Sequence, residues 1–470
     1  MHPSNLEKIM RLRHALHQHP ELSMQESYTM TLLQAFLQEN TSLEICTRDG
    51  WFYALKKGSP AEGCNGLKKG QPDIECDGLK KGQPDIECDS LKKGQPDIEC
   101  DGLKKERPET GCDGKGRIGN PIAPIAFRAD MDALPIPETI ALPYGSQNAG
   151  ISHKCGHDGH SAALCGLALE LEDMETARDI YLIFQPGEEI GAGALLCRDL
   201  IREKGIAEIY AFHNLGGYPE GSLVYRRGLT QPASEGLRIR LTGKASHASA
   251  PEKGNNPAGL LAGIVQFALG ITSQTEENHR EDLNSADNHN GNLNSAENHR
   301  EDLNSTESPD GIDAVGQERH MRLCTVTGIR LGEGDFGISP GEGEVCLTLR
   351  AEVEDEMKAM EQAVLTYAER AASDAGLQIS RSIHDYFSET RNNDACLQRV
   401  LDAAHGRKMP AIPMTEIWRA SEDFGYYLKN CPGAMFYIGN GEQYSALHTA
   451  EYDFNDRILE KAVDLFAALV

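Results

Sequence analysis

Metal-binding residue types are concentrated in one short stretch of the chain. Cys155 and His157 stand on either side of a single glycine, and His153, Asp158 and His160 complete a segment of eight residues. A tight turn at the glycine can aim a thiolate and an imidazole at the same point, as transition-metal sites require. A lone cysteine or histidine is usually structural, but this density of donors favours a metal site.

A pair of adjacent carboxylates supplies a second candidate. Glu188 and Glu189 come shortly after residues 180–184, an apolar run that is typical of a buried strand. Neighbouring side chains on an extended loop point opposite ways, so one carboxylate can bind metal while the other addresses an activated water. Such a pair taken alone is more often a solvated acidic turn, but its position after a buried strand favours a chemical role.

Further donors are predicted near other apolar runs. Asp130 and Asp132 alternate along a strand end and share one face, where a carboxylate can orient a metal-bound histidine. His213 follows the apolar run 209–212, and His448 lies near the C-terminus. Each of these motifs is weak by itself, because paired acids and single histidines are common at ordinary structural positions.

The elements that must position these donors alternate between helix and strand. Apolar residues at helical spacing predict helices over 6–16, 27–38 and 161–171. Short apolar runs predict strands over 51–55, 122–127 and 180–184. We interpret the first two strands as the arms of a hairpin with an enlarged loop. The alternation predicts an α/β fold class with active-site loops at the ends of the strands.

The chain is long enough for two domains, since its 470 residues exceed what one hydrophobic core usually organises. Beyond residue 235, strands and helices are predicted over 237–241, 257–271, 323–329, 344–349 and 355–372. We therefore expect a layered α/β catalytic domain over 1–234 and 351–470, with a smaller α+β lid domain inserted over 235–350.

Two arrays of tandem repeats interrupt this pattern. A 12-residue unit recurs through 54–113, and a 10-residue unit recurs through 277–306. Each unit holds only one or two apolar residues, too few to offset the entropy of ordering the chain, so we expect surface loops. The first array carries five of the 13 cysteines, but one cysteine per repeat does not supply the closely spaced ligand pairs of a zinc site.

Composition argues against several classes of partner. The formal net charge of −26 disfavours binding to nucleic acid or to an anionic membrane, because phosphates would be repelled. No run of 18 apolar residues occurs and the first residues lack an apolar leader, so we expect a cytoplasmic protein without a membrane partner. The cysteines outside the repeat are then expected to be reduced.

The motifs described above, together with several others, occur in a recognisable order. They lie at residues 13–22, 128–135, 153–160, 185–189, 212–214, 243–251, 421–424 and 447–448. The series closely resembles the aminoacylase/carboxypeptidase metallopeptidase family, and within it the amidohydrolase subgroup that includes hippurate hydrolases and indole-acetyl-amino-acid hydrolases. The resemblance implies a zinc-exopeptidase-like α/β/α catalytic domain. It also implies cleavage of the amide bond of small N-acyl amino acids.

The resemblance further implies roles for individual residues. Two divalent metal ions, of manganese, zinc, cobalt or nickel, would be bound by Cys155, His157, Glu189, His213 and His448. Glu188 would be the general base, taking a proton from water and passing it to the leaving amine. Asp132 would steady a metal-binding imidazole, and His247 in the lid would stabilise the oxyanion once the lid closes. The family commonly forms dimers, so a homodimer through the lid domain is a further expectation.

Substrate choice is less constrained than reaction type, because two segments depart from the family pattern. Gly337-Ile-Ser-Pro340 stands where relatives carry Asn before Val-Ile-Pro, and Trp418-Arg-Ala precedes Ser421 where Gly is commoner. The same metal centre would serve a dipeptidase, a carboxypeptidase or an N-acyl-diaminopimelate deacylase. A binding protein built on a retired enzyme scaffold is disfavoured, since all of the implied site residues are intact.

Overall fold

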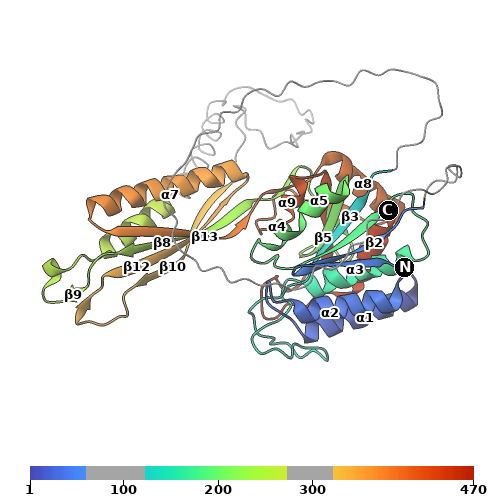
Figure 1. Cartoon of the computed structure of the whole chain (residues 1–470), viewed down its shortest axis with the longest axis horizontal. Helices are drawn as coiled ribbons and strands as arrows, with labels where there is room; N and C mark the ends of the chain where they lie inside the picture. Colours follow the sequence, from blue (N-terminus) through green and yellow to red (C-terminus); the bar gives the residue numbers. More distant parts are fainter. Residues whose placement is uncertain (60–121, 272–320) are drawn as a thin grey trace, which may run out of the picture. The chain divides into compact units, whose positions relative to one another are not determined.

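A computed structural model describes residues 1–59, 122–271 and 321–470 (Figure 1). Apart from residues 54–59, both repeat arrays lie outside these residues, so the expectation of surface loops stays a prediction. Within the described ranges, no helix has both the length and the apolar character that crossing a bilayer requires.

A mixed eight-stranded sheet forms the centre of the larger part of the fold. Its strands, in spatial order, are β1 (Glu44–Arg48), β2 (Trp51–Lys56), β4 (Ile180–Gln185), β3 (Ile125–Asp130), β5 (Glu208–Gly216), β16 (Gly433–Gly441), β6 (Leu223–Tyr225) and β15 (Ala411–Pro413). The four neighbours β4, β3, β5 and β16 run parallel. Every residue of β3 and β4 is buried, as expected for parallel strands that are covered on both faces.

Helices cover both faces of this sheet. One core is shared with α1 (Pro3–Gln18), α2 (Ser27–Asn40), α3 (His157–Leu171), α8 (Asp394–Gly406) and α10 (Leu459–Leu469). A second core is shared with the short helices α4 (Gly193–Cys197), α5 (Asp199–Lys204) and α9 (Gly425–Leu428). Phe127 of β3 belongs to the first core and Ala126 to the second, because successive strand residues point to opposite faces. The α/β fold class predicted from the sequence is confirmed.

The predicted hairpin between the strands at 51–55 and 122–127 is wrong. β4 lies between β2 and β3, pairing antiparallel with the first and parallel with the second. The physical reason is that β4 is buried along its whole length and apolar up to Phe184, so it is suited to the interior of the sheet, where both of its edges are paired. Nearness in sequence therefore did not decide which strands pair.

A separate antiparallel sheet of four strands, with the helices packed on it, forms the smaller unit of the fold. Its order is β10 (Arg322–Leu331), β12 (Glu342–Ala351), β8 (Ala233–Thr242) and β13 (Gln378–Phe387). Alternate residues of β12 are buried against the helix at 258–271 and against α7 (Glu354–Asp374), and Phe267 and Tyr367 of these helices stack with ring centroids 4.7 Å apart. Two small sheets pair β7 (Leu229–Gln231) with β14 (Thr390–Arg391) and β9 (Ser246–His247) with β11 (Ile338–Ser339).

The four-stranded sheet continues beyond residue 350, where the sequence placed the end of the smaller domain. β13 pairs with β8 from Gln378 to Phe387, and α7 packs on the same sheet. This long-range pairing has no local signature, because β13 alternates weakly and is mostly exposed. The domain limits themselves stay a prediction.

Candidate metal centre

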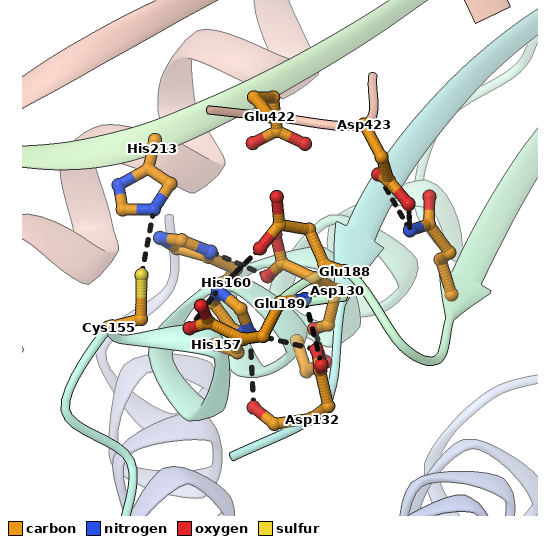
Figure 2. A network of polar contacts seen from close by, with 12 residues as sticks. Asp130, Asp132, Cys155, His157, His160, Glu188, Glu189, His213, Glu422 and Asp423 are labelled. Carbon is orange, nitrogen blue, oxygen red and sulfur yellow. Dashed lines mark hydrogen bonds and ion pairs between the residues drawn. The ribbon is translucent and has the colours of Figure 1, made fainter. Parts of the chain in front are cut away.

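The predicted site residues gather where the parallel strands β3, β4 and β5 end. Asp130 closes β3, Glu188 and Glu189 follow β4, and His213 lies towards the end of β5. The carboxyl ends of parallel strands meet at one edge of a sheet, which is why loops so distant in sequence converge there. Figure 2 shows these side chains turned towards a common centre.

A glycine sets the geometry of the cysteine and histidine ligands. Gly156 has a φ of 108°, and a Cβ there would lie 2.4 Å from Oδ1 of Asn214, so only glycine fits. Helix α3 begins immediately afterwards at His157. The turn leaves Sγ of Cys155 3.3 Å from Nε2 of His213.

Both buried imidazoles present the same nitrogen to the centre. Nδ1 of His157 lies 3.0 Å from the carbonyl oxygen of Asp132 and 3.1 Å from its Oδ1, and Nδ1 of His213 lies 2.8 Å from the carbonyl oxygen of Asn214. A carbonyl oxygen can only accept, so each Nδ1 carries a proton, and Nε2 is the nitrogen whose lone pair a metal ion would take. This is the tautomer that binds a metal through Nε2.

The carboxylates complete the centre from the loop after β4. Oε1 of Glu189 lies 3.8 Å from Nε2 of His157, and its Oε2 lies 3.4 Å from Nε2 of His448. The backbone N–H of Glu189 donates to Oδ2 of Asp132 at 3.0 Å. Oε2 of Glu188 lies 3.7 Å from Nε2 of His157. His448 lies on the C-terminal loop, and its backbone N–H donates to the carbonyl oxygen of Lys154 at 2.8 Å.

These donors fit a pair of divalent cations. Ligand atoms lie within 4.8 Å of one another in three overlapping groups: Cys155 with His157 and His213, Cys155 with Glu189 and His448, and His157 with Glu188 and Glu189. Cys155 belongs to two of the groups, so its sulfur can bridge two ions. Nε2 of His157 and Oε1 of Glu188 and Glu189 are buried without a hydrogen-bond partner in the described residues, which is rare unless an ion satisfies them. The mixture of sulfur, imidazole and carboxylate suits transition metals.

The electrostatics of the centre also favour cations. Burial lowers the pKa of His157, but Asp130 and Asp132 outweigh it and raise the pKa to about 10. Burial raises the pKa of the Cys155 thiol, and the neighbouring Glu189 and Glu188 raise it further. The pKa of Glu188 is raised by burial and then by Glu422. An excess of buried negative charge thus surrounds the centre, and bound cations would relieve it.

Sequence reasoning missed the buried ion network beside the centre. Arg128 is almost fully buried and lies 2.7 Å from Asp130, 3.0 Å from Glu422 and 2.8 Å from Asp423. Gln185 donates from Nε2 to Asp423, and His160 bonds Asp130 at 2.7 Å. The available signal was an arginine inside an otherwise apolar strand, because a buried guanidinium needs carboxylate partners.

His247 is the predicted site residue that the structure does not bring to the centre. It lies on β9, is exposed, and contacts Oγ of Ser249 through Nδ1 at 2.7 Å. It belongs to none of the metal-binding groups found among the described residues. Its predicted role requires the lid to move, so it stays a prediction.

A pocket of about 650 Å³ opens onto the metal centre. Its lining includes Arg350 and Ser421 besides the candidate ligands. Nη1 of Arg350 donates to Oγ of Ser421 at 2.6 Å and to the carbonyl of Arg419 at 2.9 Å. Burial lowers the pKa of Arg350, and no carboxylate in the described part of the chain lies within ion-pair distance of it. The pocket therefore offers a guanidinium without a counter-charge.

Comparison with known proteins finds similarity to metal-dependent hydrolases. The model of peptidase family M20/M25/M40 matches residues 126–470. The N-acetyl-L-cysteine deacetylase of Bacillus subtilis (strain 168) is 30% identical over 335 residues, which are 69% of each chain. The hippurate hydrolase of Campylobacter jejuni is 26% identical over 356 residues, or 75% of this chain and 82% of that one. The crystal structure of the Bacillus subtilis YXEP protein, a dinuclear metal-binding peptidase of the M20 family, matches with a TM-score of 0.65 and 21% identity, covering 100% of this chain and 98% of that one.

Proposed function

The chain belongs to peptidase family M20/M25/M40, and we propose that it is a two-metal amidohydrolase that cleaves N-acyl amino acids into a carboxylate and a free amino acid. The relatives named as an N-acetyl-L-cysteine deacetylase and a hippurate hydrolase support this reaction class. One observation carries the proposal: beside Glu188, donor atoms lie within 4.8 Å of one another in overlapping groups formed by Cys155, His157, Glu189, His213 and His448.

Glu188 is suited to move the proton that the reaction requires. Two divalent cations bound at the centre would polarise the acyl carbonyl and lower the pKa of a water molecule. Oε1 of Glu188 is buried and has no hydrogen-bond partner among the residues described, so it can accept the proton of the attacking water. Delivering this proton to the amide nitrogen lets the amine leave. Asp132 keeps His157 in its metal-binding orientation throughout.

Arg350 is suited to receive the free carboxylate of the substrate. Its guanidinium lines the same pocket as Glu188, and no carboxylate of the described residues lies within ion-pair distance of it. An N-acyl amino acid carries one carboxylate, which can pair with a guanidinium through two parallel hydrogen bonds. Ser421 and the carbonyl of Arg419 accept hydrogen bonds from Nη1 and leave the N–H groups of Nη2 and Nε for the substrate.

The smaller unit would act as a lid in this proposal. His247 would reach the oxyanion only after the lid moves, because it is exposed in this structure. Within the described ranges β10 and β13 have no neighbour on their outer edges, and two lids could join there as a homodimer. Light scattering of the purified protein would determine whether such a dimer forms.

The test uses the full-length protein loaded with manganese, zinc, cobalt or nickel. Release of free amino acid from N-acetyl and N-benzoyl amino acids would be followed with and without a chelator. Glu188→Gln keeps the size of the side chain but removes the base, so it should abolish turnover. Turnover that survives both the chelator and this substitution would refute the mechanism. Cleavage restricted to dipeptides with a free α-amine would instead favour the dipeptidase alternative.

A further inference from the structure

We propose that Trp418 selects substrates by their acyl group, so that this enzyme prefers aromatic or large apolar acyl groups to acetyl. The inference rests on the proposed amidohydrolase function and names the substrate class of the same pocket. Its basis is the place of the indole on the pocket wall, beside the candidate metal ligand His213.

The indole of Trp418 is held firmly against the metal centre. Its ring centroid lies 5.2 Å from that of His213 with the planes at 68°, and 5.3 Å from that of Tyr437 with the planes at 90°. The backbone N–H of Trp418 donates to the carbonyl of Thr230 at 3.0 Å, which fixes the loop. The same residue lines the pocket of about 650 Å³. A fixed aromatic ring thus bounds the space in which the substrate must lie.

Apolar residues accompany Trp418 on the side of the imidazole ligands. Leu215 follows His213 on β5 and packs in the same small cluster as Trp418. Leu447 directly precedes His448, and both line the pocket. These side chains form an apolar part of the lining next to the metal centre.

Polar residues form the part of the lining near the general base. Ser421 holds Arg350 and is followed in sequence by Glu422. Carboxylate oxygens of Glu422 lie within 4.8 Å of those of Glu188. Figure 2 shows Glu188 facing Glu422, with His213 on the other side of the centre. The polar part of the lining and the general base therefore belong to the same side.

The reaction then decides which half of the substrate lies on each side. Glu188 must reach the leaving nitrogen, and Arg350 must reach the carboxylate that the same amino acid carries. The amino acid half therefore occupies the polar side. The acyl half is then left with the part of the lining beside His213, to which Trp418 and Leu215 belong.

An aromatic acyl group should bind more tightly against Trp418 and its apolar neighbours than acetyl does. Aromatic rings in edge-to-face or offset contact stabilise each other beyond the area that they bury. A volume of about 650 Å³ also lies within the range of pockets that enclose drug-sized ligands. The structure thus favours a substrate such as an N-benzoyl or N-phenylacetyl amino acid.

The first test compares kcat/KM for N-benzoylglycine and N-acetylglycine in the wild type, Trp418→Phe and Trp418→Ala. The ratio of benzoyl to acetyl should exceed one in the wild type and fall at least about tenfold in Trp418→Ala, because a lost contact in an apolar pocket changes discrimination by about 10- to 200-fold. Trp418→Phe should retain most of the ratio. A ratio that is the same in all three proteins would overturn the inference, and metal content measured for each would show whether His213 was disturbed.

A second test detects contact between Trp418 and an acyl group without relying on catalysis. The chain has two tryptophans, so Trp51→Phe leaves Trp418 as the sole indole fluorophore. Benzoate should change its emission at concentrations where acetate does not, and equal responses would count against the inference. Failure to hydrolyse any N-acyl amino acid would refute the proposed function. Hydrolysis with an unchanged benzoyl-to-acetyl ratio would refute only the role of Trp418.

Discussion

Asp132 holds His157 and the loop of Glu189 at the same time. Its Oδ1 lies 3.1 Å from Nδ1 of His157, while its Oδ2 accepts the backbone N–H of Glu189 at 3.0 Å. One buried carboxylate thus orients two of the candidate metal ligands, which approach from different loops. Replacing this carboxylate should therefore weaken metal binding.

Asp132→Asn should therefore weaken metal binding by about 10- to 100-fold, the usual cost of losing a carboxylate that orients a ligating histidine. The amide group cannot accept from both His157 and Glu189, because one of its two ends is a donor. Isothermal titration calorimetry of the metal-free protein with manganese measures the change in affinity. Ser23 donates to Oδ2 of Asp132 at 2.7 Å, so Ser23→Ala is the matched control and should have a smaller effect. Equal metal affinity in wild type and Asp132→Asn would contradict the role.

Arg350→Met should raise KM for N-acyl amino acids by about 10- to 100-fold, since a hydrogen bond to a charged group contributes roughly 1.5–3 kcal/mol. The same variant should discriminate little between an N-acyl amino acid and its uncharged C-terminal amide. Kinetics on both substrates, with Arg350→Lys as the conservative variant, test the assignment. If the variant loses activity on both by the same factor, the guanidinium does not recognise the carboxylate.

His17 should make stability depend on pH on the alkaline side of neutrality. Its buried ring lies 2.8 Å from Asp158 through Nδ1 and 2.8 Å from Glu138 through Nε2. Burial lowers the pKa of His17, but these two acids raise it to about 9 from 6.5. The charged ring therefore stabilises the fold fully below pH 6.5, by on the order of 3 kcal/mol, and this contribution is lost as the pH rises through about 9.

Urea unfolding at pH 6 and at pH 10 tests the role of His17. His17→Gln should lower the free energy of unfolding much more at pH 6 than at pH 10. A loss of the same size at both values would show that the ring contributes by packing and not by its charge.

Arg128→Met should destabilise the protein by about 3–5 kcal/mol, because it removes the cation that the buried carboxylates of Asp130, Glu422 and Asp423 share. Arg399 pairs with Glu208 at the surface, so Arg399→Met is the control and should cost about 0–1 kcal/mol. Thermal and urea unfolding of both variants give the comparison. Similar losses for the two would mean that the buried network does not depend on its guanidinium.

Local sequence patterns were sufficient to predict many residues of the candidate site. Cys155 and His157 could be paired from sequence because both lie at one turn where a helix begins, and Glu188 and Glu189 because they follow the apolar run 180–184. Their meeting with His213 and His448 could be expected only from the order of motifs in the resembled family. No local pattern encodes a contact between side chains tens or hundreds of residues apart.

The parts that sequence did not predict depend on long-range pairing. β4 enters between β2 and β3, and β13 joins the sheet of β8, although neither choice is visible in the residues of the strand concerned. The sequence places Asp130 on the same strand as Arg128, but only the folded chain brings Glu422 and Asp423, from one distant segment, to the same guanidinium. Burial of charge is a property of the folded arrangement, so its consequences appear only there.

The central claim is that five side chains hold two cations beside Glu188, and an anomalous-difference map from crystals grown with manganese tests it most directly. The account predicts two peaks, both in contact with Cys155 and together contacting His157, Glu189, His213 and His448. Manganese bound elsewhere, or no peak among these side chains in protein that is active with manganese, would contradict it.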